Sequence, residues 1–454
     1  MDFKQFFSQL KGKKIAMCGI GVSNTPLILN FLKQGARVIA CDRRERELIG
    51  NIADELEAAG AELKLGDGYL ENLEVDIIFR TPGMNFHLPE LERARKRGIA
   101  VTSEMEVFFD LCPATIFAVT GSDGKTTTTT LIAKMLEAEG KRVFVGGNIG
   151  TPLLPEIENI TADDFVVAEL SSFQLISMRK SPDIAVVTNV APNHLDVHKD
   201  MDEYVEAKKN ILLHQNAFSR TILNRDNDIT EDFRKDVRGQ SLGVSMTRRL
   251  NNGAWLADDG VLHMAYRGID VPVIDRKDIR ILGDHNVENY LTAIAAVWGY
   301  VGVDNIKKVA QEFGGVEHRI EFVCEKKGVK YYNDSKGTNT DAAIKAIDAM
   351  PSETVLIAGG YDKNGDYTEW VSRFPGKVRK LVLIGQTREK IAAACDEAGF
   401  KDYCFAEDLK QAVEICKQTA QEGDYCLLSP ACASWGMFKN YQQRGDMFKE
   451  YVKG

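Results

Sequence analysis

Short, nearly continuous apolar runs that end in small or polar residues recur along this chain. The clearest runs lie at 14–19, 165–169, 184–188, 355–359 and 381–385. Runs of this kind are typical of parallel strands that are buried on both faces. Between them, apolar residues recur at helical spacing, as in the segment 131–139, which Gly140 follows. This alternation predicts an α/β fold with mostly parallel sheets.

The length of the chain predicts three domains. Its 454 residues exceed what one hydrophobic core usually organises, and domains average about 150 residues. No low-complexity linker or internal repeat marks a boundary, so we place the boundaries where each α/β set restarts. The expected domains are 1–105, 106–313 and 314–454.

Charge and cysteine usage exclude several classes of protein. The formal net charge is -9 and no run of lysines or arginines suggests a local exception, so no nucleic-acid partner is expected and the substrate should be small. The nine cysteines form no C-x-x-C pair, which argues against zinc and redox sites and for a reducing compartment. The first residues lack the apolar core of a signal peptide, and no apolar run approaches the roughly 18 residues of a membrane span. We therefore expect a cytoplasmic protein without a membrane span.

The segment 118–127, Ala-Val-Thr-Gly-Ser-Asp-Gly-Lys-Thr-Thr, is the strongest chemical signal in the sequence. An apolar strand runs through a glycine turn into a helix, an arrangement that brings backbone N–H groups and the positive helix end to phosphate oxygens. Lys125 adds a positive charge, and the hydroxyl of Thr126 can hold Mg²⁺. The turn is shorter than the usual phosphate-binding loop, because Val119 stands where that loop has its first glycine. The segment predicts a nucleoside triphosphate site in the central domain.

A second nucleotide signal lies near the start of the chain. The turn Gly19-Ile20-Gly21-Val22-Ser23-Asn24 follows a strand, and Asp42 closes the next one, as in dinucleotide-binding folds. Asn24 replaces the third glycine of that motif and weakens an interpretation as an NAD or NADP site. A tight turn without a ligand is one alternative, and a site for another nucleotide, such as a UDP-linked substrate, agrees better with the second nucleotide site downstream.

Three further residues of the central segment are candidate metal ligands. Glu169 closes a strand and could coordinate Mg²⁺ or cap a helix, and His194 follows another strand and could cap a loop or bind a metal. Lys208 lies on the apolar face of a helix that begins near Asp202. Such a lysine could extend to solvent, or burial could keep it neutral so that it reacts with CO₂ to form a metal-binding carbamate.

The third segment contains three polar clusters, at 318–319, 333–339 and 429–434. Two of them directly follow predicted strands, and ligands in open α/β sheets bind at the carboxyl ends of strands. Each cluster alone could be an ordinary turn.

These motifs together resemble the ATP-dependent Mur ligases. The resemblance covers the whole chain in order and rests on 121–127, 146–150, 169–174, 194–196, 204–208, 285–289 and 317–319. Within that family, the run 333–339 and the ending 428–445 resemble the branch that adds D-glutamate.

The resemblance implies a fold, a reaction and substrates. It implies an N-terminal Rossmann-like UDP-binding domain, a central P-loop ATPase domain and a C-terminal Rossmann-like domain. It further implies that ATP phosphorylates the carboxylate of UDP-N-acetylmuramoyl-L-alanine and that D-glutamate attacks the acyl phosphate, in cytoplasmic peptidoglycan precursor synthesis. A monomer is expected.

The resemblance also implies roles for residues in the central domain. Lys125 would neutralise the γ-phosphate, Thr126 and Glu169 would hold a first Mg²⁺, and His194 with carbamoylated Lys208 would hold a second. Lys125, Lys208, His194 and Asn148 would be catalytic, with Asn148 near the reacting carboxylate. The nucleotide contacts would be Gly121, Ser122, Asp123, Gly124, Lys125, Thr126, Thr127, Asn286, Asn289, Arg319 and Asp334.

The remaining implied residues would bind the two other substrates. Ser23, Asn24, Asp42, Arg43 and Gly83 would hold the uridine diphosphate. Thr338, Lys363, Ser434 and the backbone of Tyr441 would hold the amino acid, with Lys363 pairing a carboxylate of D-glutamate. The family otherwise carries asparagine or histidine at Asp123, whose charge should weaken ATP binding unless it points away from the phosphates or meets the metal.

Other functions remain to be compared with a Mur-type ligase. A folylpolyglutamate-type ligase resembles the family from the phosphate loop onward but lacks the preceding nucleotide fold. A GTPase should contain Asn-Lys-x-Asp, which is absent here. A non-catalytic nucleotide-binding regulator would not need Lys208 on an apolar helix face or the polar clusters of the third segment.

Overall fold

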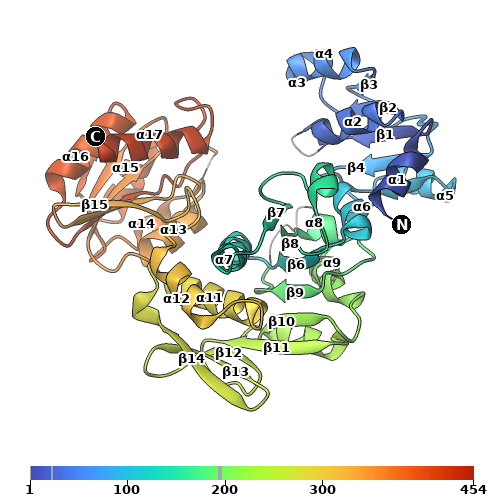
Figure 1. The fold of residues 1–454 in the computed structure, drawn as a ribbon. Coiled ribbons are helices and arrows are strands. Elements are labelled where there is room, and N and C mark those ends of the chain that lie inside the picture. Colours follow the sequence, from blue (N-terminus) through green and yellow to red (C-terminus); the bar gives the residue numbers. More distant parts are fainter. Residues whose placement is uncertain (1, 22–23, 193–196, 364) are drawn as a thin grey trace. The chain divides into compact units, whose positions relative to one another are not determined.

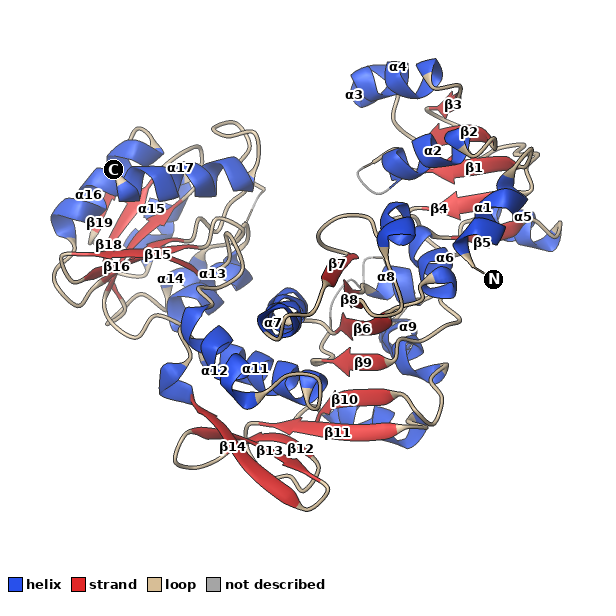
Figure 2. Cartoon of the chain, viewed as in Figure 1, coloured by secondary structure: helices blue, strands red, loops and turns tan. Residues whose placement is uncertain are grey.

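The fold is a mixed α/β structure with three sheets rich in parallel pairings (Figures 1 and 2). It comes from a computed structural model that describes residues 2–21, 24–192, 197–363 and 365–454. The chain forms two compact units: residues 1–275 with 288–309, and residues 276–287 with 310–454. The first unit contains two of the sheets and the second unit contains the third. The predicted fold class, α/β with mostly parallel sheets, is confirmed at this level.

The first sheet has the order β3-β2-β1-β4-β5, and its neighbouring strands are parallel. Its strands are β1 (Lys14–Cys18), β2 (Arg37–Asp42), β3 (Glu62–Leu65), β4 (Ile77–Arg80) and β5 (Ala100–Thr102). Its helices are α1 (Phe3–Leu10), α2 (Asn24–Lys33), α3 (Arg46–Ile49), α4 (Asn51–Ala58), α5 (Pro89–Lys96) and α6 (Glu104–Leu111). Strand order reverses at β1, so the loops after β1 and β4 leave the same edge of the sheet, where such folds bind ligands.

The central sheet has the order β14-β13-β12-β11-β10-β9-β6-β8-β7. Its strands are β6 (Thr115–Thr120), β7 (Val143–Gly147), β8 (Phe165–Glu169), β9 (Ile184–Val187), β10 (Arg220–Asn224), β11 (Gln240–Ser245), β12 (Gly253–Leu256), β13 (Val261–Tyr266) and β14 (Ile269–Asp275). The pairings from β7 through to β12 are parallel, whereas β12–β13 and β13–β14 are antiparallel. The antiparallel end connects through turns that need no crossover helix.

Helices cover both faces of the central sheet (Figure 1). Within the first unit they are α7 (Lys125–Ala138), α8 (Ser172–Leu175), α9 (Met201–Leu213), α10 (Asp228–Asp232) and most of α11 (Asp284–Val297) and α12 (Val303–Glu312), with the short 3₁₀ turns η1 (Leu154–Asn159) and η2 (Phe233–Asp236). The 3₁₀ turn η3 (Arg276–Asp278) belongs to the second unit. Helix α7 packs on β6, β7 and β8, and α9 packs on β6 and β9. Side chains alternate across β6, so both helices bury apolar residues against this strand.

The third sheet has the order β15-β16-β20-β17-β18-β19. Its strands are β15 (Glu321–Lys326), β16 (Val329–Asn333), β17 (Thr354–Ala358), β18 (Val378–Leu383), β19 (Tyr403–Phe405) and β20 (Tyr425–Leu428). Its helices are α13 (Thr340–Asp348), α14 (Thr368–Val371), α15 (Arg388–Glu397), α16 (Leu409–Thr419) and α17 (Tyr441–Lys453). Only β15 pairs antiparallel among these described strands, and β16 and β20 lie side by side in parallel. The polar clusters that follow β16 and β20 therefore meet at one edge of the sheet.

Within the described ranges, no helix is both long and apolar enough to cross a membrane. The three domains expected at 1–105, 106–313 and 314–454 stay a prediction at the level of their boundaries.

Candidate active site

The glycine turn between β6 and α7 is a crowded backbone loop. Gly121 has φ +150° and Gly124 has φ +77°, and Gly124 is the N-cap of α7. A Cβ atom on Gly121 would collide with the hydroxyl of Thr188, and one on Gly124 would collide with the side chain of Asn289. Only glycine can hold this backbone without strain in so little space. The turn therefore requires glycine at both positions, and its role as a phosphate site stays a prediction.

Two lysines lie against the carbonyls of this loop. Lys125 Nζ donates to the carbonyls of Gly121 and Ser122, at 3.0 Å each. Lys208 Nζ, on α9, donates to the Gly121 carbonyl at 2.7 Å. Two lysine side chains from different helices thus contact one turn, and the ammonium of Lys125 there favours an anionic ligand.

Glu169 links the turn to the loop after β7. Thr126 Oγ1 donates to Glu169 Oε2 at 2.7 Å, and Asn148 Nδ2 donates to Glu169 Oε1 at 2.8 Å. Glu169 is almost fully buried at the carboxyl end of β8. A hydroxyl and a carboxylate held together at the start of a helix are the ligand types that Mg²⁺ prefers, so this pair fits a magnesium ion.

Lys208 on α9 is buried, which favours the second of the two alternatives that its position on an apolar helix face left open. Its side chain is among the largest fully buried ones, and its Nζ lies 4.6 Å from the centroid of the Tyr204 ring. Burial, followed by the positive charge of Lys125, lowers the pKa of Lys208 to about 7. Near neutral pH a substantial fraction of this lysine is therefore an uncharged amine, which is nucleophilic.

Neighbouring residues fix the shape of the loop. Asp123 N donates to Asn189 Oδ1 at 2.9 Å, and Thr188 Oγ1 donates to the Asp123 carbonyl at 2.6 Å. The hydroxyls of Ser122 and Tyr204 lie 2.9 Å apart. These bonds connect the turn to the residues after β9 and to α9, and the Asp123 side chain stays exposed. Sequence reasoning did not assign this supporting role to Thr188 and Asn189, although Thr188 ends a predicted strand and Asn189 directly follows it.

The predicted residues of the first sheet gather at the ends of β1 and β2. Asn24 is buried and its Nδ2 donates to the carbonyls of Cys18 and Gly19, at 3.2 and 2.9 Å. Asp42 accepts from Ile20 N at 2.7 Å and from the backbone N and Nε of Arg44, at 2.9 Å each. The pKa of Asp42 is lowered, because these hydrogen bonds to its charged form outweigh its partial burial.

The partner of Asp42 is Arg44, which the sequence did not single out. The predicted Arg43 and Gly83 are both exposed.

A cavity of about 130 Å³ lies between the loops of the first and central sheets. Its lining residues are Asn24, Pro82, Ser103, Glu104, Met105, Gly147, Asn148 and Gln174. The cavity thus brings together Asn24 and Asn148, two predicted substrate residues from different sheets.

In the second unit, the loops after β16 and β20 are tied by hydrogen bonds. Asp334 is buried and accepts from Ser429 Oγ at 2.7 Å, and complete burial raises its pKa to about 7. Arg444, on α17, donates through Nε to Ser335 Oγ at 3.0 Å and through Nη1 to the Cys432 carbonyl at 3.2 Å. The fully buried Arg444 therefore joins both loops, and burial lowers its pKa to about 10.

Arg319 projects from a strained turn beside these loops. It is exposed, whereas its neighbours His318 and Ile320 are buried at φ +64° and +42°, in the left-handed region. His318 Nδ1 accepts from Asn333 Nδ2 at 3.0 Å, so its neutral form carries the proton on Nε2. This bond anchors the turn and leaves the Arg319 side chain pointing outward.

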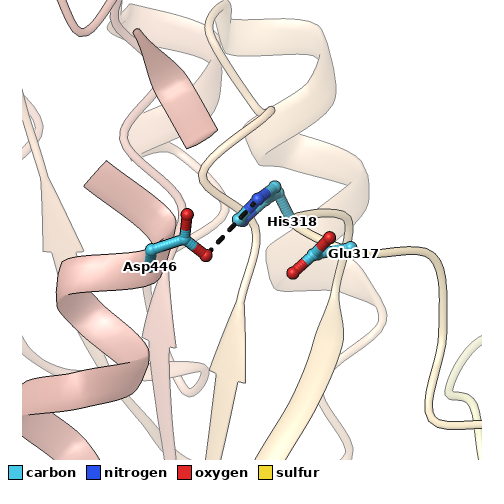
Figure 3. Close-up of side chains that lie close together, drawn as sticks. All are labelled: Glu317, His318 and Asp446. Carbon is cyan, nitrogen blue, oxygen red and sulfur yellow. Dashed lines mark ion pairs between the residues drawn. The ribbon is translucent and has the colours of Figure 1, made fainter. Parts of the chain in front are cut away.

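Glu317, His318 and Asp446 lie close enough together to suggest a metal site, with ligand atoms within 4.8 Å of one another (Figure 3). The Nε2 of His318 faces Asp446 Oδ1 at 3.9 Å. The ammonium group of Lys449 pairs with both Glu317 and Asp446. Because a lysine already balances both carboxylates and Nε2 carries a proton, this cluster is an ion-pair network rather than a metal centre.

The predicted amino-acid residues lie around the same edge of the third sheet. Lys363 is exposed, with its Nζ 4.8 Å from the ring centroid of Trp435, and Thr338 is partly exposed. Ser434 is buried. The backbone carbonyl of Tyr441 accepts from Ser335 Oγ at 2.7 Å.

The other predicted residues lie on α11, on α7 or outside the described ranges. Asn286 and Asn289 are both buried on α11, and Asn289 Oδ1 accepts from Thr128 Oγ1 at 3.3 Å. Thr127 is buried within the first turn of α7. The predicted residues Ser23 and His194 fall outside the described residues.

Comparison with known proteins gives a consistent result over the whole chain. Residues 119–297 match the family described as "Mur ligase middle domain", and residues 318–432 match "Mur ligase, glutamate ligase domain". A relative from Acetivibrio thermocellus is 48% identical over 99% of this chain and 98% of its own length. A relative from Clostridium botulinum is 44% identical over 99% of both chains. Both are named "UDP-N-acetylmuramoylalanine--D-glutamate ligase".

Solved structures share the fold at low sequence identity. The UDP-N-acetylmuramate-alanine ligase of Thermotoga maritima is 18% identical, with a TM-score of 0.57 over 97% of this chain and 99% of that one. A UDP-N-acetylmuramoyl-L-alanyl-D-glutamate--2,6-diaminopimelate ligase is 19% identical, with a TM-score of 0.55 over 87% of this chain and 86% of that one. These structures support the fold alone, whereas the family models and the full-length relatives confirm the resemblance predicted from the sequence motifs.

Proposed function

This chain belongs to the Mur ligase family, and from that premise we propose that it joins D-glutamate to UDP-N-acetylmuramoyl-L-alanine at the expense of ATP. The observation that carries the proposal is the full-length similarity, at 44–48% identity, to relatives named for this reaction. The reaction would serve peptidoglycan precursor synthesis in the cytoplasm. The proposed domains are 1–105 for the UDP substrate, 106–313 for ATP and 314–454 for the amino acid, and both matched family ranges fall inside these boundaries.

The crowded glycine turn supports the ATP site. Backbone N–H groups of the turn and the start of α7 would bind the phosphates, and the ammonium of Lys125 would leave its loop carbonyls to pair with the γ-phosphate. Thr126 and Glu169 would hold a first Mg²⁺, whose positive charge would offset the negative charge of the phosphates. Asn286, Asn289, Arg319 and Asp334 are the further nucleotide contacts that we propose.

Lys208 fits a carbamate better than a free ammonium. A pKa of about 7 makes the neutral amine available, and the amine can add to CO₂ with loss of one proton to give an anionic carbamate. The resulting carboxylate would exchange the present hydrogen bond to Gly121 for a second Mg²⁺, with His194 as the other proposed ligand. The positive charge of Lys125 nearby favours the anion.

The substrate carboxylate would lie near Asn148, which lines the cavity between the two sheets of the first unit. Phosphorylation of that carboxylate would give an acyl phosphate, and the amine of D-glutamate would attack its carbonyl carbon and release phosphate. The uridine diphosphate would bind at the loops of β1, β2 and β4, near Asn24, Asp42, Arg43 and Gly83. Lys363 would pair with a carboxylate of D-glutamate, beside Thr338, Ser434 and Tyr441.

Phosphate release tests the function directly. Protein with ATP, Mg²⁺ and UDP-N-acetylmuramoyl-L-alanine is assayed with D-glutamate, L-glutamate, L-lysine or no amino acid. We expect release only when the UDP substrate and D-glutamate are both present. Release without either substrate, or release with L-lysine in place of D-glutamate, would contradict the proposal.

A further inference from the structure

Arg80 is a buried cation whose position between the two sheets of the first unit has no role in the site described above. It closes β4, next to Cys18 at the end of β1, and its side chain is 1% exposed. Burial lowers its pKa. Because burying a guanidinium group is costly unless its contacts are specific, its partners indicate what it holds in place.

The partners of Arg80 lie on α8 and in the segment that follows it, after strand β8 of the central sheet. Its Nη2 donates to the Phe173 carbonyl at 2.9 Å and to Ser177 Oγ at 2.7 Å. Ser177 Oγ in turn donates to Glu106 Oε2 at 2.9 Å, so the positive charge is balanced through one hydroxyl. Phe173 lies on α8, which begins three residues after Glu169. The contact therefore connects Arg80 to the segment that directly follows Glu169, a proposed magnesium ligand.

The backbone on the other side of Arg80 forms the proposed uridine diphosphate loop. Thr81 N donates to the Cys18 carbonyl at 2.9 Å, and a Cβ on Gly19 would collide with the Thr81 side chain. The loops after β1 and β4 are thus packed tightly together. A shift of Arg80 would move Thr81, and with it the loop that carries Gly83.

Among the described residues, the other guanidinium nitrogens of Arg80 make no directional contact with a third segment. Nε and Nη1 of Arg80 are buried and have no hydrogen-bond partner, and the guanidinium carbon lies 5.4 Å from the centroid of the Phe86 ring. An aromatic face can accept a cation but gives no directional bond. The directional contacts of Arg80 are therefore those to α8 and Ser177.

We propose that Arg80 is a positioning residue that aligns the uridine diphosphate loop with the Glu169 segment, so that the substrate held by the first sheet presents its carboxylate to the glycine turn. This inference rests on the proposed function. Reacting groups held within a few tenths of an ångström react far faster than misaligned ones, and an error of about 1 Å costs about 100-fold in rate. Arg80 touches no reacting atom and acts only through this alignment.

The test compares Arg80→Met, Arg80→Lys and Ser177→Ala with the wild type. Arg80→Met should lower kcat of the ligation about 10- to 100-fold, while the Kd values of UDP and of ATP change less than about twofold, because each nucleotide binds to one sheet. Arg80→Lys should recover part of kcat, since lysine can make one of the two bonds. Ser177→Ala removes only one of the two hydrogen-bond partners of Arg80, so it should lower kcat less than Arg80→Met does.

Arg93→Met is the matched control, because Arg93 is an exposed arginine on α5 that pairs with Glu90. It should leave kcat and both Kd values unchanged. A purely structural role for Arg80 would lower the melting temperature and leave kcat of the folded enzyme intact. Unchanged kcat in all three variants, or equal losses in kcat and in both nucleotide affinities, would overturn the inference.

A second measurement separates this inference from the proposed function. Hydrogen exchange of the backbone amides at 172–177 is followed as UDP-N-acetylmuramoyl-L-alanine is added. In the wild type the exchange should slow on binding, and in Arg80→Met it should not respond. This coupling is measured without turnover, so an inactive wild type would refute the ligase function alone. Binding of the substrate to the wild type is measured in the same samples, and bound substrate that does not slow the exchange would overturn the role of Arg80.

Discussion

The glycine turn of the central sheet and the polar loops of the third sheet are built in different ways. In the turn, the side chains expected to do chemistry bond to one another or to the loop, as Thr126 does to Glu169 and Lys208 to Gly121. In the third sheet, the buried Arg444 and Asp334 fix the loops, whereas Arg319 and Lys363 lie exposed. The difference indicates that the first region is preorganised for charge stabilisation, and that the second presents adjustable side chains from a fixed backbone.

The largest effect should come from the preorganised region. Lys125→Met removes the cation of the glycine turn and should lower kcat/KM of the ligation about 10²- to 10³-fold, since the γ-phosphate loses a charged donor. Phosphate release measures the effect. Lys134→Met is the control, because Lys134 is an exposed lysine of the same helix that pairs with Glu137. A loss of kcat/KM below tenfold in Lys125→Met would contradict the idea that the glycine turn is preorganised and the third sheet is not.

Lys208→Ala should lower activity about 100-fold because it removes a buried residue that we propose as a metal ligand, and added acetate should restore part of the activity. Lys209→Ala should change little, because Lys209 pairs with Glu206 instead of facing the turn. Indifference of activity to Lys208→Ala would contradict the carbamate.

The pKa of Lys208 also predicts a pH dependence. With a folded-state pKa of about 7, lowered from 10.5, the neutral amine is lost as pH falls through 7. After CO₂ is stripped, reactivation at a fixed concentration of dissolved CO₂ should therefore be faster at pH 8 than at pH 6, as initial rates of phosphate release would show. Equal rates of reactivation at both pH values would mean that the neutral amine of Lys208 does not limit reactivation by CO₂.

An exposed ligand of the third sheet should have a smaller, more selective effect. Lys363→Gln should raise KM for D-glutamate about tenfold by removing one charge pair, while KM for ATP stays unchanged. Lys410→Gln, at an exposed lysine of α16, is the control. A fall in kcat with unchanged KM for D-glutamate would place Lys363 among the preorganised groups instead.

The smallest effect should come from Asp123. Its exposed carboxylate lies on the glycine turn, so Asp123→Asn should lower KM for ATP by about threefold or less, and the difference should shrink at high salt. Asp163→Asn, at another exposed position, should leave this KM unchanged. A rise in KM would mean that Asp123 assists nucleotide or metal binding.

Local patterns in the sequence were enough to predict the strands and the glycine turn. The runs at 165–169 and 184–188 became β8 and β9, and the apolar face that includes Lys208 is buried as its helical spacing requires. These features depend on residues that are near one another in the chain, where periodicity is informative. The antiparallel strands β12–β14 were not predicted individually.

Tertiary partners could not be predicted in the same way. Asp42 pairs with Arg44 rather than with its neighbour Arg43, and the choice depends on where a turn points each side chain. Arginine is usually exposed, but Arg80 and Arg444 are buried. Their burial could not be predicted, because their hydrogen-bond partners are far away in the sequence. A single sequence carries no signal for such contacts.

The pair formed by Lys363 and Trp435 gives the protein an optical reporter of its own. Among the four tryptophans of the chain, Trp370 is fully buried, whereas Trp435 is 55% exposed and lies under the Lys363 ammonium. A ligand that draws Lys363 away changes the electric field at the indole ring and with it the wavelength and yield of emission. Occupancy of the third sheet could then be followed by intrinsic fluorescence, without a label and without turnover.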